Sequence, residues 1–520
     1  MSEREHDSFE PHAHCCPCTP QRVAPQGLSR RAFLGGTALG GVALTGLSWS
    51  LLSAAESEFD PAPPRKPLKV KPILVYSIPK RREKSSWRNW GGIETQEQAD
   101  EEVVRIRGEL DQLKATADFP VEFLPITAVQ AARELAEMAD VEAADTLLVF
   151  AAGGGGGEYN AIGNFKKDTI LFVRHQSGPV YLWYEIISPR YLRQHTDTLK
   201  TVGVDEQDVV VDRMDEVLWR LRALGGLKNT IGSRIVAIGG LAGWAQPDEA
   251  IAKLVEQRWK LDVRSVDYPQ LGELIKAARA DQAAVERSKR RAALYLAQPQ
   301  TVLETGTAYV ENAFLLDDVF RRLMKETDCR AITVNHCMGT IMPMSETTAC
   351  MTLSTLNDAG FLAFCESDFV VIPSGLLLAN ISGLPVFLND PTYPHDNLIT
   401  LAHCTAPRKM DGKSPEPARI MTHFESDYGA APKVDMPKGQ VVTNIIPDFK
   451  AERWVGLTGE IVDHPLLPIC RSQIDIRYTC DSLRLAERMP GFHWMTSYGN
   501  YLRELGYALK RIPIQWEVLS

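Results

Sequence analysis

From residue 73 onward, short apolar runs rich in β-branched residues alternate with longer segments of helical periodicity, and this alternation constrains the fold most. Strand-like runs at 73–78 and 146–152 flank a helical segment at 96–115, and a similar series begins at 234–240. Strands that alternate with helices usually pair in parallel, with helices on both faces of the sheet. The alternation therefore predicts an α/β protein.

The carboxyl-terminal part follows a different pattern. From residue 385 to about 478, short β-rich runs such as 398–404, 441–446 and 454–461 are separated by turn residues. This spacing is typical of an antiparallel sheet or a small barrel. We expect that part to follow the α/β units, with a last helix at 498–509.

At 520 residues the chain is too long for a single hydrophobic core, so several domains are expected. Its formal net charge of -9 argues against nucleic acid or an anionic membrane as the main partner. The expected divisions are a leader at 1–60, a proline-rich linker at 61–72, an amino-terminal domain at 73–230, a second domain at 231–330 and a carboxyl-terminal domain at 331–520.

The leader contains the motif S-R-R-A-F-L at 29–34, followed by an apolar stretch at 33–52 and small residues at 53–55. This order predicts a twin-arginine export signal and hence a periplasmic protein that uses the twin-arginine translocase. The protein would stay in the cytoplasm if the signal were not used. An uncleaved membrane anchor is the alternative reading of the apolar stretch.

Three of the ten cysteines lie in the leader, at Cys15, Cys16 and Cys18. The others are odd in number, lie mostly inside apolar runs and form no C-x-x-C pair. Buried free thiols are the favoured reading, with disulfides second, and a zinc ribbon is not supported.

Three apolar runs end in residues that can bind a metal. Glu366 follows F-L-A-F-C, Asp390 follows P-V-F-L-N, and His403 follows L-I-T-L-A. A helix at 373–382 would join the first two runs as parallel neighbours, so that the carboxylates meet where strand ends converge. Two carboxylates and an imidazole suit a divalent ion of the Mn, Mg or Fe type. Asp368 could replace Glu366 or support the ligands.

Several further residues could contact a ligand. The glycines at 153–157 lack the spacing of a nucleotide motif and predict a loop that lines a cleft. Trp244, together with Trp87 and Trp90, could stack on a sugar ring, although packing between domains is an equal alternative. His493 offers a second imidazole before the last helix.

At these residues the chain resembles the L-fucose/L-arabinose isomerase superfamily, and most closely its shorter bacterial fucose-isomerase-like members. The shared motifs are C-E-S-D at 365–368, I-S-G-L-P at 381–385 leading to Asp390, H-C-T-A-P at 403–407, and a histidine ahead of Y-G-N-Y at 498–501. The resemblance implies two Rossmann-like amino-terminal domains and a carboxyl-terminal α/β domain with an antiparallel β-barrel-like part, assembled as a homo-trimer or homo-hexamer.

The resemblance also implies roles for the site residues. Glu366 and Asp390 would bind the metal, expected to be Mn²⁺, and transfer protons, and His403 and His493 would be metal ligands or substrate contacts. The expected activity is metal-dependent aldose–ketose isomerisation of a small-molecule sugar through an enediol. The alternatives are an exported, non-catalytic sugar-binding protein and a different metal-dependent carbohydrate enzyme, such as an epimerase, a lyase or a hydrolase.

Overall fold

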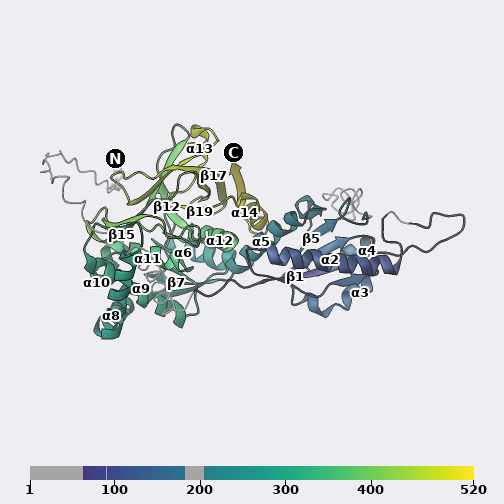
Figure 1. Ribbon diagram of the computed structural model, residues 1–520, viewed down its shortest axis with the longest axis horizontal. Helices are drawn as coiled ribbons and strands as arrows, with labels where there is room; N and C mark the ends of the chain where they lie inside the picture. Colours follow the sequence, from purple (N-terminus) through teal and green to yellow (C-terminus); the bar gives the residue numbers. More distant parts are fainter. Residues whose placement is uncertain (1–61, 89–90, 182–203) are drawn as a thin grey trace, which may run out of the picture. The chain divides into compact units, whose positions relative to one another are not determined.

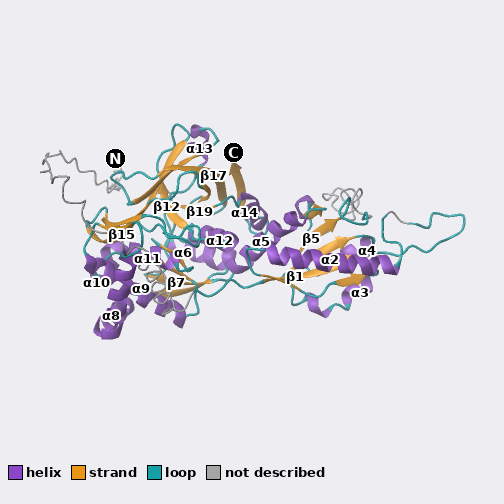
Figure 2. Cartoon of the chain, viewed as in Figure 1, coloured by secondary structure: helices purple, strands orange, loops and turns teal. Residues whose placement is uncertain are grey.

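The computed structural model describes residues 62–88, 91–181 and 204–520, all within the unit Leu51–Ser520 (Figure 1). The leader expected at 1–60 lies outside these residues, together with its twin-arginine motif. Among the described residues, no helix combines the length and the apolar character needed to span a bilayer. Parallel sheets and an antiparallel barrel make up the β structure, as the sequence patterns predict (Figure 2).

The first sheet is wholly parallel, in the order β2-β1-β4-β5-β6, and β3 also pairs with β1. Its strand β1 starts inside the expected linker at 61–72, because Leu68 and Val70 are buried and the Lys71 amine reaches Asp140 at 2.6 Å. The strands are β1 (Leu68–Val75), β2 (Val121–Phe123), β3 (Thr127–Val129), β4 (Thr146–Ala151), β5 (Asp168–Val173) and β6 (Val209–Val211).

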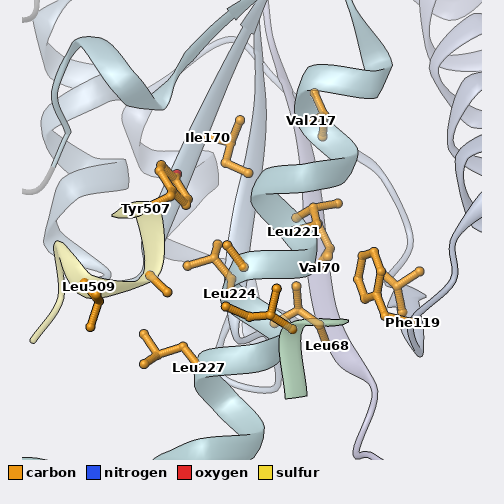
Figure 3. Packing of buried hydrophobic residues seen from close by; sticks show 14 of the residues in the cluster. Leu68, Val70, Phe119, Ile170, Val217, Leu221, Leu224, Leu227, Tyr507 and Leu509 are labelled. Atoms are coloured by element: carbon orange, nitrogen blue, oxygen red, sulfur yellow. The ribbon is translucent and has the colours of Figure 1, made fainter. Parts of the chain in front are cut away.

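Helices surround this sheet. The glycines at 153–157 were expected to form a loop. The loop covers only 153–155, because Gly156 and Gly157 are the first residues of a helix. One long helix carries Leu221 and Leu224, which pack with Leu68 of β1 and with Tyr507 from the end of the chain (Figure 3). The helices are α2 (Gln96–Thr116), α3 (Ala132–Ala136), α4 (Gly156–Asn164) and α5 (Met214–Thr230).

The second sheet is also parallel, in the order β11-β10-β7-β8, with strands β7 (Arg234–Ile238), β8 (Asp262–Val266), β10 (Ala331–Val334) and β11 (Leu362–Phe364). Since β10 pairs with β7, the domain boundary expected between residues 330 and 331 falls inside this sheet. Its associated helices are α6 (Asp248–Lys253), α7 (Tyr268–Ala280), α8 (Gln282–Leu296), α9 (Thr307–Glu326), α10 (Met342–Ser345) and α11 (Ala349–Asp358).

The carboxyl-terminal strands close into a six-stranded antiparallel barrel. The order is β16-β19-β12-β13-β18-β17, and a further pairing of β16 with β17 completes the circle. Its strands are β12 (Phe387–Pro391), β13 (Leu398–His403), β16 (Val441–Pro447), β17 (Arg453–Asp463), β18 (Ser472–Arg477) and β19 (Trp494–Tyr498).

Smaller elements border the barrel. Strand β20 (Gln515–Leu519) pairs in parallel with β17, and a separate sheet has the order β15-β14-β9. The remaining elements are β9 (Thr301–Leu303), β14 (Ala418–His423), β15 (Tyr428–Val434), α12 (Ile372–Ser382), α13 (Ser482–Arg488) and α14 (Leu502–Leu509).

One expectation about the connection between Glu366 and Asp390 is wrong. Strand β11 belongs to the second parallel sheet, whereas β12 belongs to the barrel and pairs only in antiparallel fashion. The helix α12 that joins them is buried along its whole length. A helix enclosed on all sides lies between layers, so it carries the chain from one sheet to another rather than back to a neighbouring strand.

Candidate metal centre and active site

Four side chains meet where the second sheet approaches the barrel. Glu366 lies 3.5 Å from His403, measured from Oε1 to Nε2, and 3.2 Å from His493, measured from Oε2 to Nε2. The Oδ1 atom of Asp390 lies 3.3 Å from the same His493 nitrogen. The structure therefore brings together Glu366, Asp390, His403 and His493, although the strands that carry the two acids are not neighbours.

The parallel sheet presents its share of the site on strained backbone. The chain passes through positive φ after β7 at Gly239 (78°), after β10 at His336 (43°) and after β11 at Glu366 (64°) and Ser367 (47°). Glycine is required at 239, because a Cβ there would lie 2.1 Å from the Tyr268 hydroxyl. Left-handed residues other than glycine are uncommon and gather at functional sites.

The barrel presents its share through strand register. Asp390 of β12 stands opposite Ala402 of β13, which directly precedes His403. On the other side of β12, Asn389 stands opposite Trp494 of β19, which directly follows His493. Adjacent ladder positions thus bring Asp390 close enough to both histidines for their charges to affect its pKa.

Each imidazole is oriented by a second partner on its other nitrogen. His403 Nδ1 lies 2.9 Å from the Thr405 hydroxyl, and His493 Nδ1 lies 2.7 Å from Asp368 Oδ2. Both Nε2 atoms are therefore directed at the carboxylates. Such outer partners fix ring orientation in metal sites, and Asp368 occupies this supporting position rather than a place among the four converging groups.

The four groups fit a divalent cation. Asp390 Oδ1 and His493 Nε2 are buried and lie 3.3 Å apart, but neither makes a hydrogen bond of acceptable geometry to a described residue. Ligand atoms at right angles around an octahedral ion with bonds of about 2.1 Å stand about 3 Å apart, close to the separations of 3.2 to 3.5 Å between the imidazole nitrogens and the carboxylate oxygens. Two carboxylates and two imidazoles form a donor set suited to Mn²⁺ or Mg²⁺.

The protonation of the site follows from its charges. Burial opposes ionisation of Glu366, but hydrogen bonds and charge from His403 and His493 hold its pKa below the ordinary range. Burial raises the pKa of Asp390, with Glu366 acting in the same direction and the imidazoles against it. Burial opposes protonation of His493, yet its hydrogen bond to Asp368 and the nearby negative charge of Glu366 raise its pKa to about 10.

His403 behaves similarly. Burial works against its protonated form, but the hydrogen bond to Glu366 and the charge of Asp390 raise its pKa. Protons therefore compete with a cation for the two imidazoles, because only the deprotonated ring can bind a metal.

Three residues that were not predicted as site residues lie close to the site: Cys365, His423 and Glu425. The Cys365 thiol offers a donor atom within 4.8 Å of donor atoms of Glu366 and His403, but burial raises the pKa of the thiol and keeps it neutral. Burial lowers the pKa of His423, at the end of β14. The negative charge of Glu425, in the following turn, works to raise the pKa of both His423 and Asp390. The C-E-S-D motif could have pointed to Cys365, but no local pattern marks the other two.

The aromatic candidates differ in position. Trp244 is 47% exposed, with its ring 4.7 Å from Phe492 and 6.1 Å from His493, so it borders the site. Trp87 lies between β1 and α2, where the Arg88 guanidinium packs 4.9 Å from its ring. No contact among the described residues joins Trp87 to the converging groups, and Trp90 lies outside the described residues.

Comparison with known proteins gives one informative result. No family model matches the chain. Among curated proteins, the chain is distantly similar to an isomerase of a sugar. That relative is the sulfoquinovose isomerase of Clostridium sp. (strain MSTE9), which is 25% identical over 231 residues. The aligned part covers 42% of this chain and 51% of the relative, so the chain spans about half the length of the curated relative it matches.

Proposed function

We propose that the protein is a metal-dependent sugar isomerase that interconverts an aldose and a ketose. The observation that carries the proposal is the convergence of Glu366, Asp390, His403 and His493, with Asp390 Oδ1 and His493 Nε2 buried and without a well-formed hydrogen bond to a described residue. The distant similarity to a sulfoquinovose isomerase supports the reaction class and makes a sugar the substrate to test first.

Glu366, Asp390, His403 and His493 would hold the cation, which we propose to be Mn²⁺. When bound, such an ion polarises adjacent carbonyl and hydroxyl oxygens of the sugar as a Lewis acid. Asp368 and Thr405 would keep the two imidazoles turned toward it, through their contacts at 2.7 Å and 2.9 Å.

The two carboxylates would divide the proton transfers. Isomerisation requires one proton to move between C2 and C1, and another to move between the oxygens on those carbons. Glu366 is 41% exposed and can reach a sugar carbon, so we assign it the carbon-bound proton. Asp390 is 27% exposed and would transfer the proton between oxygens. An enediol forms between the two carbon steps.

Glu366→Gln tests the role of that carboxylate. Turnover should fall by about a hundredfold or more, the usual effect of losing a general acid or base. Aldose-to-ketose conversion and deuterium incorporation from solvent at C1 and C2 would be measured with Mn²⁺ and with metal content checked. Glu286→Gln on α8, a half-exposed glutamate that contacts Lys289 and Gln282 of the same helix, is the control and should remain active. Near-wild-type turnover of Glu366→Gln would reject the assignment.

Export and assembly are further proposals. The twin-arginine motif at 29–34 supports translocation to the periplasm, and the family resemblance supports a homo-trimer or homo-hexamer. Fractionation of cells that express the full chain, and light scattering of the purified protein, would test the two in turn.

A further inference from the structure

A cavity lies at the amino-terminal ends of strands β10 and β11 of the second parallel sheet, whereas the proposed metal centre lies beyond their carboxyl-terminal ends. Its volume is about 420 Å³, within the usual range of small-molecule sites. Arg330 and Phe361 line it, and each directly precedes a strand, since β10 begins at Ala331 and β11 at Leu362. Glu366 follows β11, so the cavity and the metal centre occupy opposite ends of the same strands.

The cavity wall combines apolar surface with positive charge. The apolar part comes from Leu294 and Tyr295 of α8, Phe314 of α9, and Phe361 and Leu384 in loops. The basic side chains that line the cavity are Arg291, Arg321, Arg330 and Lys409. A ligand that fits this wall carries both a negative group and an apolar portion.

Two of these arginines already have counter-ions. Arg291 and Arg321 both bond Asp317, each at 2.7 Å, and Asp317 is fully buried. Their guanidinium groups also lie over the lining rings Phe314 and Phe361, at 4.7 Å and 5.0 Å. These arginines therefore shape the cavity wall with much of their charge neutralised.

Arg330 differs, because its partners are neutral. Its Nε donates to the Gly360 carbonyl at 3.1 Å and its Nη1 to the Asn380 side-chain oxygen at 3.3 Å. In the part of the chain that the structure describes, no ion pair joins Arg330 to a carboxylate. Burial lowers the pKa of Arg330 to about 10, and the positive charge of Arg65 adds to the effect. A partly buried charge without a counter-ion is costly, so an anion entering here would be stabilised.

One acid does line the cavity. Asp358 at the end of α11 accepts the backbone N–H groups of Arg408 and Lys409, both at 2.7 Å. These bonds use the carboxylate to hold the loop that carries Lys409. Asp358 therefore has a structural task that does not neutralise Arg330.

We propose that this cavity binds a small organic anion. Its phosphate, sulfonate or carboxylate group would pair with Arg330 and Lys409, and its apolar portion would lie against Phe361 and Leu384. Guanidinium favours such planar or tetrahedral oxyanions because it can donate two parallel hydrogen bonds. The ligand is distinct from the sugar at the metal centre, since the two sites lie at opposite strand ends.

Anion titration of the full chain with Mn²⁺ bound tests the proposal. Inorganic phosphate, methanesulfonate and acetate would be compared with chloride at equal ionic strength, by calorimetry and by thermal unfolding. We expect at least one oxyanion to bind, and Arg330→Gln to weaken its binding by about tenfold to a hundredfold, as for loss of a charged hydrogen bond. The preferred anion identifies the acidic group of the ligand.

Arg322→Gln is the matched control, because Arg322 lies on α9, is 67% exposed and pairs with Glu326 on the same helix. Salts that are excluded from the protein surface would stabilise the fold of both variants equally. Specific binding is therefore measured by the difference in anion response between Arg330→Gln and Arg322→Gln. Equal anion binding by Arg330→Gln and Arg322→Gln overturns the proposal. If Arg330→Gln does not fold, the anion affinity of Arg330→Lys is compared with that of wild type. Weaker oxyanion binding by Arg330→Lys supports the proposal, and equal binding overturns it. Absence of any oxyanion binding by wild type beyond that of chloride also overturns it.

Discussion

The two halves of the proposed metal centre are built in different ways. Glu366 and Asp368 come from a loop after a parallel strand, where Glu366 and Ser367 have φ of 64° and 47°. Asp390, His403 and His493 come from the antiparallel barrel, where strand register sets their spacing. The two barrel histidines are nearly enclosed, with His493 0% and His403 6% exposed, whereas Asp390 is 27% and Glu366 41% exposed. Of the four converging side chains, Glu366 is therefore the most open to a substrate.

His493→Ala would test the barrel half most severely. The substitution removes a ligand and leaves Asp368 buried without its partner. Since loss of an outer partner alone weakens metal binding by about 10-fold to 100-fold, we expect more than about a hundredfold here, with activity lost in parallel. Metal titration of the purified variant would measure it. His395→Ala, at an exposed turn histidine, should behave as wild type, and retained Mn²⁺ affinity in His493→Ala would remove the barrel from the metal centre.

Asp368→Asn separates orientation from ligation. The amide can still accept from His493 Nδ1 but no longer supplies a negative charge, so Mn²⁺ affinity should fall by about 10-fold to 100-fold. The kcat of the fully loaded enzyme should change much less. Assays across a range of Mn²⁺ concentrations would distinguish the two effects. A loss of kcat that saturating Mn²⁺ fails to restore would make Asp368 a participant in the reaction itself.

Acidity should weaken metal binding through the barrel histidines. A raised folded-state pKa means that His493 stabilises the metal-free fold below about pH 6.5, and that this contribution is lost as pH rises toward its pKa of about 10. Metal binding has the opposite dependence, since the imidazoles must lose their protons. Mn²⁺ affinity should rise by up to about tenfold per pH unit for each proton released. Calorimetry in buffers of different ionisation enthalpy would count those protons, and a pH-independent affinity would contradict the ligand assignment.

Trp244→Leu probes the substrate side with the smallest expected effect. Aromatic contacts contribute about 0.5–1.5 kcal/mol beyond their burial, so KM for the sugar should rise by a few-fold while Mn²⁺ affinity stays unchanged. Steady-state kinetics would show it. Trp87→Leu is the comparison, because Trp87 has no described contact with the site. An equal rise in KM in both variants would mean that Trp87 also reaches the sugar.

The sequence predicted which side chains converge better than it predicted the path of the chain between them. Glu366, Asp390 and His403 could be identified because each ends an apolar run, a local signal. The change of sheet between Glu366 and Asp390 could not, because an apolar helix of α12's length fits a crossover equally well. Closure of the barrel depends on pairings between strands far apart in the sequence, such as β12 with β19 and β13 with β18, which no local pattern specifies.

Helix α5 shows why other elements escaped prediction. Its sequence contains Gly225 and Gly226, which lower helix propensity and obscure the periodicity. In the structure a Cβ at 226 would lie 2.3 Å from the Ile381 side chain, so the glycine permits α12 to approach closely. His423 and Glu425 reach the site only through the fold of a different sheet, and no spacing in the sequence links them to Glu366.

The enclosure of α12 limits how this protein can diverge. Its 11 residues measure about 16 Å along the axis and fix the distance travelled between Glu366 and Asp390. Adding or removing one residue within α12 would rotate each later side chain of the helix by about 100° about the helix axis. Those side chains would then no longer fit their buried positions. Insertions and deletions between residues 366 and 390 should therefore be rare among homologues of this protein, and they should be more frequent in the exposed turn after Asp390.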